Sequence, residues 1–388
     1  MKVAYVGVKG LPATAGGDRV VEAIATRMPS LGINPTVYCD PEYSQKDIKI
    51  PGIEIIYIPS IPGKYLRSSS QLFFSALHAV FFRRFDLIHL HHIESSFILP
   101  ILRLHYKVVS TSHGFAYWRE KWGYLARRIL RLLDILFMKM SNAVTVVSAR
   151  DADELASRFG TQPVYIPNGV ESNYELDYDQ ASAILINHGL HPQKFFIFVA
   201  GRIEPTKGAH IAIESVNNLL HDTHLLIVGD DKQIPQYRQH LHEISGPKIH
   251  FQSFVEDRET LYGLMASSLC LVFPSQVEAM SIVLLETASL GVPIVCSDIA
   301  ENRIVMGDDA LYFELDNPGS LREQLHWILE HPEKVVNMSQ QARVRIQTEY
   351  SWDTIAARYA RLYDQTCWKK GKNQIFDEYS SSEELLDE

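Results

Sequence analysis

The stretch GRIEPTKG, residues 201–208, follows an apolar run over residues 195–200 that is typical of a buried strand. In a doubly wound fold, the turn after such a strand lies at the carboxyl edge of the sheet, where Arg202 and Lys207 can hold a phosphate. A second stretch, EAMSIVLLE over residues 278–286, begins in a loop and continues as an apolar helix whose amino end can meet the same anion. Two cations, a helix amino terminus and two carboxylates predict a site for a sugar joined to a diphosphate.

The length of the chain, 388 residues, exceeds what one hydrophobic core usually supports and fits two domains of about 170 to 190 residues. In both halves short apolar runs alternate with helical patterns, and this order predicts parallel, doubly wound sheets. In the first half, strands are expected over residues 3–8, 36–39, 53–58, 87–91, 108–111 and 144–147. In the second half, they are expected over residues 195–200, 225–228, 249–251, 269–273 and 294–296.

Changes in composition along the chain suggest where the domains begin and end. We expect a first domain over residues 1–170, a polar and turn-rich hinge over 171–193, and a second domain over 194–350. A helical pattern over residues 351–368 has no strand after it. The charged and Ser-rich residues 369–388 are expected to form a disordered acidic tail, because such a composition buries too little apolar surface to fold.

The net charge of −9 conceals two halves of opposite sign. Residues 1–170 contain 20 Lys and Arg against 13 Asp and Glu, whereas residues 171–388 contain 17 against 33. A basic half on an acidic protein favours an anionic partner, either a phospholipid surface or a diphosphate-linked acceptor, and we expect no nucleic-acid partner. The alternative is an accident of surface composition.

Two segments of the basic half have the features of interfacial helices. Residues 65–85 are rich in Phe with arginines at both ends, and residues 118–140 place an apolar stripe on one helical face with arginines opposite. The stripe consists of Leu125, Ile129, Leu132, Leu136 and Met140, and the arginines are Arg67, Arg83, Arg84, Arg127 and Arg131. Such a helix can lie on an anionic leaflet, or the stripe can pack against its own sheet and leave the arginines solvated.

The four cysteines, Cys39, Cys270, Cys296 and Cys367, are far apart and form no CxxC pair. They are expected to be buried free thiols in a reducing compartment. The apolar run between Lys2 and Lys9 is too short for a signal-peptide core, and no run reaches the roughly eighteen apolar residues that span a bilayer. We expect a cytoplasmic protein, peripheral on the cytoplasmic membrane if the anionic partner is a lipid surface.

Six segments, taken in order, resemble the retaining glycosyltransferases of family 4. They are VGVKGLPATAGGDRVVE (6–22), TSHG (111–114), IPNGV (166–170), the two stretches quoted above and YSW (350–352). The resemblance runs across nearly the whole chain before the tail. It implies the α/β fold called GT-B, in which two Rossmann-like domains face a cleft and the last helix crosses back onto the first domain. The segment HGFAYWREKWGYLARRIL (113–130) is similar to a bacterial subset associated with polysaccharide assembly, including members assigned as rhamnosyltransferases.

The resemblance implies catalytic roles for four residues. Arg202 and Lys207 match the pair that binds the diphosphate, and Glu278 would hydrogen-bond hydroxyls of the donor sugar. His113 matches a histidine that faces that sugar, where a neutral imidazole can donate one hydrogen bond. For His113 the alternative is a satisfied loop histidine, and for Glu278 and Glu286 the alternative is a pair of ordinary surface charges.

The resemblance also implies contacts to the donor nucleotide. The backbone amides of Met280, Ser281 and Ile282 would meet the phosphate, and Glu286 would hold the ribose hydroxyls. The chain departs from the common pattern, because Ala279 and Ser281 stand where glycines are frequent. This departure leaves the preferred donor open.

Gly16 and Gly17 stand where a helix amino end can face an anion, although a tight turn that needs glycine would look the same. The one Asp-x-Asp, residues 151–153, lies in a polar helical stretch and is expected to be a solvated helix start. His89, His91 and His92 resemble a zinc cluster, but no carboxylate or Cys stands nearby at metal spacing, so structural histidines at a strand end are favoured. We therefore expect no metal and no separate cofactor.

The resemblance, taken together with these residues, implies a retaining, metal-independent hexosyltransferase that takes its sugar from a nucleotide-diphosphate donor. The acceptor would be the hydroxyl of a saccharide or a lipid-linked molecule in bacterial polysaccharide or glycolipid synthesis. The alternatives are a GT-B epimerase or phosphorylase and a non-catalytic sugar-binding protein of the same fold. The intact set of Arg202, Lys207, Glu278 and Glu286 argues against the non-catalytic reading.

Overall fold

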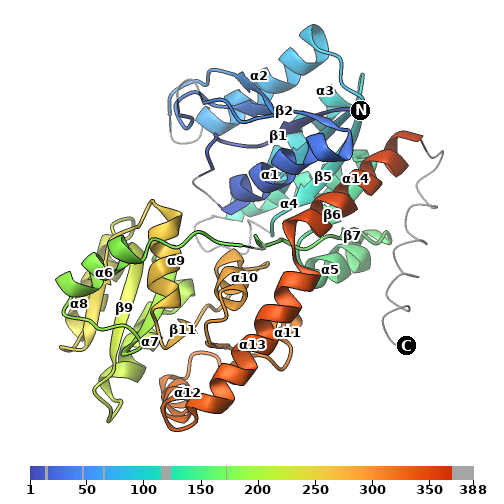
Figure 1. Ribbon diagram of the computed structural model, residues 1–388. Coiled ribbons are helices and arrows are strands. Elements are labelled where there is room, and N and C mark those ends of the chain that lie inside the picture. The colour runs from blue at the N-terminus through green and yellow to red at the C-terminus, as the bar shows by residue number, and fades with distance from the viewer. Residues whose placement is uncertain (14–15, 46–47, 64–65, 115–123, 172, 369–388) are drawn as a thin grey trace. The chain divides into compact units, whose positions relative to one another are not determined.

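The computed structural model describes residues 1–13, 16–45, 48–63, 66–114, 124–171 and 173–368 (Figure 1). The described residues form two compact units: the first consists of those within Met1–Asn168 and 352–368, and the second of those within Gly169–Ser351. Within the segment expected to be a hinge, Tyr178–Asn187 forms helix α6 of the second unit. The expected tail, residues 369–388, lies outside the described residues.

The first unit is built on a parallel seven-stranded sheet in the order β3-β2-β1-β4-β5-β6-β7. Its strands are β1 (Lys2–Val6), β2 (Asn34–Cys39), β3 (Glu54–Tyr57), β4 (Leu87–His91), β5 (Lys107–Ser112), β6 (Ala143–Val146) and β7 (Val164–Tyr165). The central strands are buried on both faces, which explains their nearly continuous apolar runs. The six strands expected from the sequence are confirmed, and the two-residue strand β7 is an addition.

Helices cover both faces of this sheet. They are α1 (Gly16–Arg27), η1 (Met28–Leu31), α2 (Leu66–Phe82), η2 (Ile93–Ile98), α3 (Leu99–Leu102), α4 (Tyr124–Met140), α5 (Ala149–Phe159) and α14 (Trp352–Trp368). Ala4 and Val6 pack with α2 and α3, whereas the Tyr5 hydroxyl accepts a hydrogen bond from Tyr363 of α14 at 3.2 Å. Because alternate strand residues point to opposite faces, α14 and its neighbour α1 lie on the face opposite α2 and α3.

The second unit repeats this architecture with a parallel six-stranded sheet in the order β10-β9-β8-β11-β12-β13. Its strands are β8 (Phe195–Arg202), β9 (His224–Asp230), β10 (Ile249–Gln252), β11 (Cys270–Phe273), β12 (Ile294–Ser297) and β13 (Leu311–Phe313). Around it lie η4 (Pro205–Lys207), α7 (Ala209–Asn217), α8 (Pro235–Ile244), α9 (Arg258–Ala266), α10 (Ile282–Ser289), α11 (Ala300–Met306), α12 (Pro318–Glu330) and α13 (Pro332–Glu349). The expected strands are confirmed, and the sequence pattern missed β13.

The chain returns from the second unit to the first between α13 and α14. A polar network in the interior of the first unit holds α14: His89 lies 2.6 Å from the Tyr363 hydroxyl and 2.6 Å from the Thr111 hydroxyl. The expected last helix that crosses back onto the first domain is therefore confirmed. Cys39, Cys270 and Cys296 are buried free thiols, whereas Cys367 is only partly buried. None of the helices in the described part of the chain is long and apolar enough to cross a membrane.

Candidate active site

The first motif lies at the carboxyl edge of the second sheet. β8 ends at Arg202, and the turn η4 follows with Lys207 as its last residue. β11 is the neighbour of β8, so the loop after β11 emerges at the same edge. The two loops are joined by a hydrogen bond of 2.8 Å from the Gln276 N–H to the Thr206 carbonyl. The fold thus brings together segments that are about seventy residues apart in the sequence.

The final glycine of GRIEPTKG is required by the contact between these loops. Gly208 has a φ of +72°, and a Cβ on it would lie 2.2 Å from the Pro274 carbonyl oxygen. A side chain there would force apart the turn that carries Lys207 and the loop that carries Glu278. Glycine at this position therefore lets the two loops approach closely enough for Lys207 and Glu278 to meet.

Lys207 and Glu278 form an ion pair at the junction of the two loops. The Lys207 Nζ lies 2.6 Å from the Glu278 Oε1, and the Ser275 hydroxyl donates to the same oxygen at 2.6 Å. The Lys207 side chain is 29% exposed and that of Glu278 is 11% exposed. The carboxylate is thus held from two sides, and the ammonium keeps an exposed surface toward which an anion can approach.

Helix α10 begins at Ile282, four residues after Glu278. Ser281 is its N-cap, and the Ser281 hydroxyl accepts a hydrogen bond from the Leu284 N–H at 3.3 Å. The N–H groups of the first turn have no partner within the helix, so the partial positive charge of the helix lies beside the Lys207–Glu278 pair. Met280 is buried, whereas Ser281 and Ile282 are partly exposed. Serine at position 281 therefore has a structural reason, because it caps the helix.

Glu286 lies one turn further along α10, in the interior. Its Oε1 accepts hydrogen bonds from Arg258 at 2.7 Å and from the Tyr262 hydroxyl at 2.8 Å. The Glu286 side chain is 3% exposed, and that of Arg258 is 42% exposed. Burial and then the Glu286 charge raise the pKa of Tyr262, which therefore stays protonated as a donor. The pattern of the sequence did not identify Arg258 or Tyr262, which lie on a different helix, α9.

Arg202 is exposed at the end of β8, beside Asp230 in the register of the sheet. Within the described residues the Arg202 guanidinium makes no hydrogen bond or ion pair. The pKa of Asp230 is lowered mainly by the hydrogen bonds that its carboxylate accepts from Gln233 and from the Lys232 N–H, and the Arg202 charge lowers it further. The five donors of Arg202 are consequently available to an incoming anion. Arg202, Lys207 and the amino end of α10 all lie at the carboxyl edge of the second sheet, and these three groups are called the cationic edge below.

The remaining predicted residues lie in the first unit. α1 begins at Gly16, which is exposed, and a Cβ on Gly17 would lie 2.8 Å from the His92 ring. A larger residue at position 17 would therefore displace His92. The His92 ring lies 4.8 Å from that of His113, centroid to centroid, so the glycine loop and the histidines form one cluster.

His113 follows β5 and is partly buried. Its Nε2 lies 2.9 Å from the Nδ1 of His91, the last residue of β4. Burial, with smaller contributions from the charges of His92 and His89, holds the pKa of His113 well below its usual range. The imidazole is therefore neutral at physiological pH, as the hydrogen-bonding role implied by the sequence requires.

The described residues contain no group of three or more His, Cys, Asp or Glu side chains that could hold a metal ion. His89 and His91 are fully buried and hydrogen-bonded to protein groups. Asp151 lies in the first turn of α5, as expected for a helix start, but the expectation that it is solvated is wrong: the residue is buried.

The structure also decides between the two readings of the apolar stripe on α4. The helix packs on the core through Leu130, Phe137 and Met138, whereas Ile129 and Leu132 of the stripe are 51% and 61% exposed. The expectation that the stripe packs against its own sheet is therefore wrong for these two residues. The side chains of Leu125 and Arg127 lie outside the described residues.

The two doubly wound parallel sheets, with the last helix returned to the first unit, define the GT-B class of folds. Two family profiles match the chain: Glycosyl transferases group 1 over residues 183–345 and Glycosyltransferase Family 4 over residues 14–174. The chain belongs to the group 1 glycosyltransferases, family 4.

Individual relatives are distant. The D-rhamnosyltransferase WbpZ of Pseudomonas aeruginosa is 29% identical over 157 residues, which cover 39% of this chain and 40% of that protein. The UDP-Gal:alpha-D-GlcNAc-diphosphoundecaprenol alpha-1,3-galactosyltransferase of Escherichia coli is 23% identical over 365 residues. The aligned residues make up 89% of this chain and 92% of that protein. The crystal structure of Anabaena HepE in complex with UDP-glucose superposes with a TM-score of 0.78 at 17% identity, covering 94% of this chain and all of that one.

Proposed function

We propose that this protein is a retaining glycosyltransferase that moves a hexose from a nucleotide-diphosphate donor to an acceptor hydroxyl, in the synthesis of a bacterial polysaccharide or glycolipid. The observation that carries the proposal is the cationic edge of the second sheet, where Lys207 is paired with Glu278 beside the amino end of α10. Two relatives add support, because one is named a rhamnosyltransferase and the other a galactosyltransferase acting on a diphosphoundecaprenol-linked sugar.

In the proposed reaction, the bond between the anomeric carbon and the diphosphate breaks while a bond to the acceptor oxygen forms on the same face. The proton of the acceptor hydroxyl passes to the departing phosphate oxygen. Arg202, Lys207 and the first-turn amides of α10 neutralise the charge that grows on the diphosphate, so neither a metal nor a separate cofactor is needed. Glu278 orients Lys207 and accepts hydrogen bonds from the sugar hydroxyls.

The nucleoside is assigned to the α9–α10 side of the site. We propose that Glu286, held by Arg258 and Tyr262, accepts hydrogen bonds from the ribose hydroxyls, and that the more exposed Arg258 meets the same nucleoside. Gly16 and Gly17, at the amino end of α1, would offer backbone N–H groups to an anion. His113 would donate a hydrogen bond to the donor sugar.

The test is turnover by the purified full chain with UDP-, GDP-, ADP- and dTDP-sugars. We expect slow release of nucleoside diphosphate from one of these donors without acceptor, and a product that keeps the anomeric configuration when an acceptor is added. Binding of a donor without any release would favour the non-catalytic alternative. Interconversion of the donor's own sugar would favour an epimerase, and release that requires inorganic phosphate would favour a phosphorylase.

We further propose that the protein is cytoplasmic and reaches a lipid-linked acceptor by docking on an anionic phospholipid surface. The docking surface is the outer side of α2, α3 and α4, which lie against one another on the first unit. Exposed apolar side chains project from it, including Phe81 at 71% and Phe82 at 75% exposed on α2, and Ile129 and Leu132 on α4. Such a layer of exposed apolar side chains is typical of an interfacial helix.

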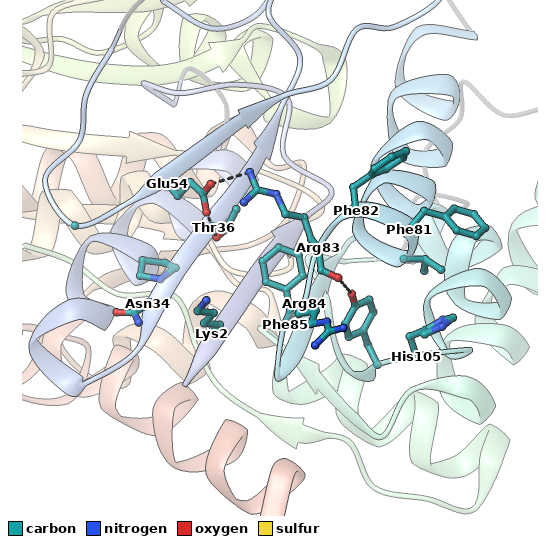
Figure 2. Close-up of a pocket in the computed structure, with 14 residues that line it drawn as sticks. Lys2, Asn34, Thr36, Glu54, Phe81, Phe82, Arg83, Arg84, Phe85 and His105 are labelled. Atoms are coloured by element: carbon teal, nitrogen blue, oxygen red, sulfur yellow. Dashed lines mark hydrogen bonds and ion pairs between the residues drawn. The ribbon is translucent and has the colours of Figure 1, made fainter.

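The charge of this surface matches an anionic leaflet. Residues 66–85, 99–106 and 124–140 contain a single acidic residue, Asp134, which is buried against Arg158 at 2.7 Å. A cavity of about 970 Å³ lies at the end of α2, and its lining includes Lys2, Arg84 and His105. Phe81 and Phe82 also line this cavity (Figure 2). Arg83 also lines the cavity and is paired with Glu54 at 2.8 Å. Cations at an anionic leaflet contribute about 1 kcal/mol each.

Co-sedimentation with phosphatidylglycerol and phosphatidylcholine vesicles tests the docking proposal. We expect binding to anionic vesicles that falls at high salt, and a loss of about tenfold or more in the Phe81→Ser/Phe82→Ser double variant. Leu220→Ser is the matched control, because Leu220 is 95% exposed on the second unit. Equal binding to neutral and anionic vesicles, or none to either, would leave a soluble acceptor as the better reading.

A further inference from the structure

His91 is a buried histidine for which the proposed reaction has no role. It ends β4 with no exposed surface, and its ring lies against the rings of Tyr5 and His89, with centroids 6.2 Å and 4.0 Å away. A Cβ on Gly7 would lie 2.5 Å from the His91 carbonyl oxygen, so glycine at position 7 lets the neighbouring strand come close to the His91 backbone. The neighbouring rings of Tyr5 and His89 and the hydrogen bond to His113 fix the orientation of the His91 ring.

The contact between His91 and His113 is an in-plane hydrogen bond. The Nδ1 of His91 and the Nε2 of His113 are 2.9 Å apart, the ring planes differ by 17°, and the centroids are 5.3 Å apart. Two imidazoles joined edge to edge by an N–H···N bond have this geometry. Burial and the neighbouring histidines hold the pKa values of both rings well below the usual range, so both rings are neutral. One proton lies between the two nitrogens.

Only two proton arrangements satisfy this contact. In the first, His91 donates from Nδ1, its Nε2 is a bare lone pair, and His113 carries its proton on Nδ1. In the second, His113 donates from Nε2 and His91 carries a proton on its own Nε2. That Nε2 is buried and has no hydrogen-bond partner within the described residues. A buried N–H without an acceptor is rarer than a buried acceptor without a donor, so the first arrangement is favoured.

We infer that His91 is a positioning residue that holds His113 in the tautomer with the proton on Nδ1. The His113 ring then presents a fixed N–H donor, because Nε2 is engaged by His91 and Nδ1 makes no hydrogen bond within the described part of the chain. The charged or titratable groups that face the pair are Tyr5, His89, His92 and, beyond His92, the carboxylate of Asp18. The consequence of this inference rests on the proposed function, since the Nδ1–H of His113 would contact the sugar of the nucleotide-sugar substrate.

The tautomer itself can be measured without any activity. Long-range ¹H–¹⁵N spectra of the full chain labelled at histidine distinguish Nδ1–H from Nε2–H, and the His113 signals are assigned by their loss in His113→Asn. We expect His113 to be protonated on Nδ1 in the unmodified protein. A His113 protonated on Nε2 would overturn the inference, whether or not the protein transfers sugars.

Two variants test the consequence. His91→Leu removes the donor to His113, and we expect turnover to fall by about tenfold with an almost unchanged KM for the nucleotide sugar, because one hydrogen bond is misdirected. His91→Asn can place its amide N–H near the original Nδ1, and it should restore most of the turnover and the Nδ1–H tautomer. If His91→Leu does not fold, the unmodified protein and His91→Asn still decide the matter. Full turnover in a folded His91→Leu, or an unchanged His113 tautomer in it, would refute the positioning role.

Discussion

Replacing Lys207 with methionine removes one cation from the proposed diphosphate site while keeping most of the side-chain volume. One preorganised donor to a developing anion is worth about 10²–10³ in turnover, so kcat should fall by that factor. The expected cost in stability is small, about 1 kcal/mol or less, because the pair is partly exposed and Ser275 still donates to the Glu278 carboxylate. Catalysis should therefore suffer far more than folding.

The assay is the initial rate of nucleoside diphosphate release, measured beside urea unfolding of the same preparations. Lys334→Met is the control, because Lys334 is exposed on α13. Glu278→Gln separates the roles of the pair: it keeps acceptor capacity for Ser275 but no longer attracts the Lys207 charge. We expect an intermediate loss of turnover in this variant. Turnover within about threefold of the unmodified protein in Lys207→Met would refute the assigned role.

Three further predictions follow from the same geometry. Activity should stay within about twofold in excess EDTA, and a loss that manganese or magnesium restores would contradict the cation route. Gly208→Ala should destabilise by several kcal/mol in urea unfolding, whereas Gly189→Ala, with a φ of +65° and open space around it, should cost only about 1 kcal/mol; equal losses would contradict the close-contact argument. Burial lowers the pKa of His89 to about 3 and holds that of His91 well below 6.5. As the pH falls, these two imidazoles become protonated in the unfolded chain but stay neutral in the folded chain. The free energy of unfolding should therefore fall by roughly 2 kcal/mol per histidine from about pH 7.5 to about pH 5. A flat pH profile would show that the folded state accommodates these charges.

The parts of the fold that the sequence predicted are those with strong local signals. Short apolar runs such as Phe195–Ala200, followed by a turn that contains glycine, are too short for a buried helix and therefore predict buried strands. Their alternation with helical patterns predicts a doubly wound order. The strands β7 and β13 were missed because two or three residues carry no periodicity. The meeting of Lys207 with Glu278 was foreseeable, since the two loops follow strands of one parallel sheet.

What the sequence could not predict depends on side-chain direction and on contacts across the fold. On α4, residues 129 and 132 belong to one apolar face and residues 130 and 137 to another, and only the packed structure shows that the second face is buried. Arg258 and Tyr262 reach Glu286 from a different helix, so spacing along the chain gave no signal. His91 was correctly placed as a structural histidine at a strand end, but its bond to His113 depends on the pairing of β4 with β5.

The central claim is that a nucleoside diphosphate binds at the carboxyl edge of the second sheet. Calorimetric titration of UDP, GDP, ADP and dTDP into the full chain tests it most directly, with Arg202→Ala as the probe variant. Arg238→Ala is its control, because the Arg238 side chain is 48% exposed and is paired with Asp231 on the same unit. We predict that at least one of these nucleotides binds, that Arg202→Ala weakens its binding by about tenfold or more, and that Arg238→Ala leaves the affinity unchanged. Binding of none of them, or unchanged affinity in Arg202→Ala, would contradict the account.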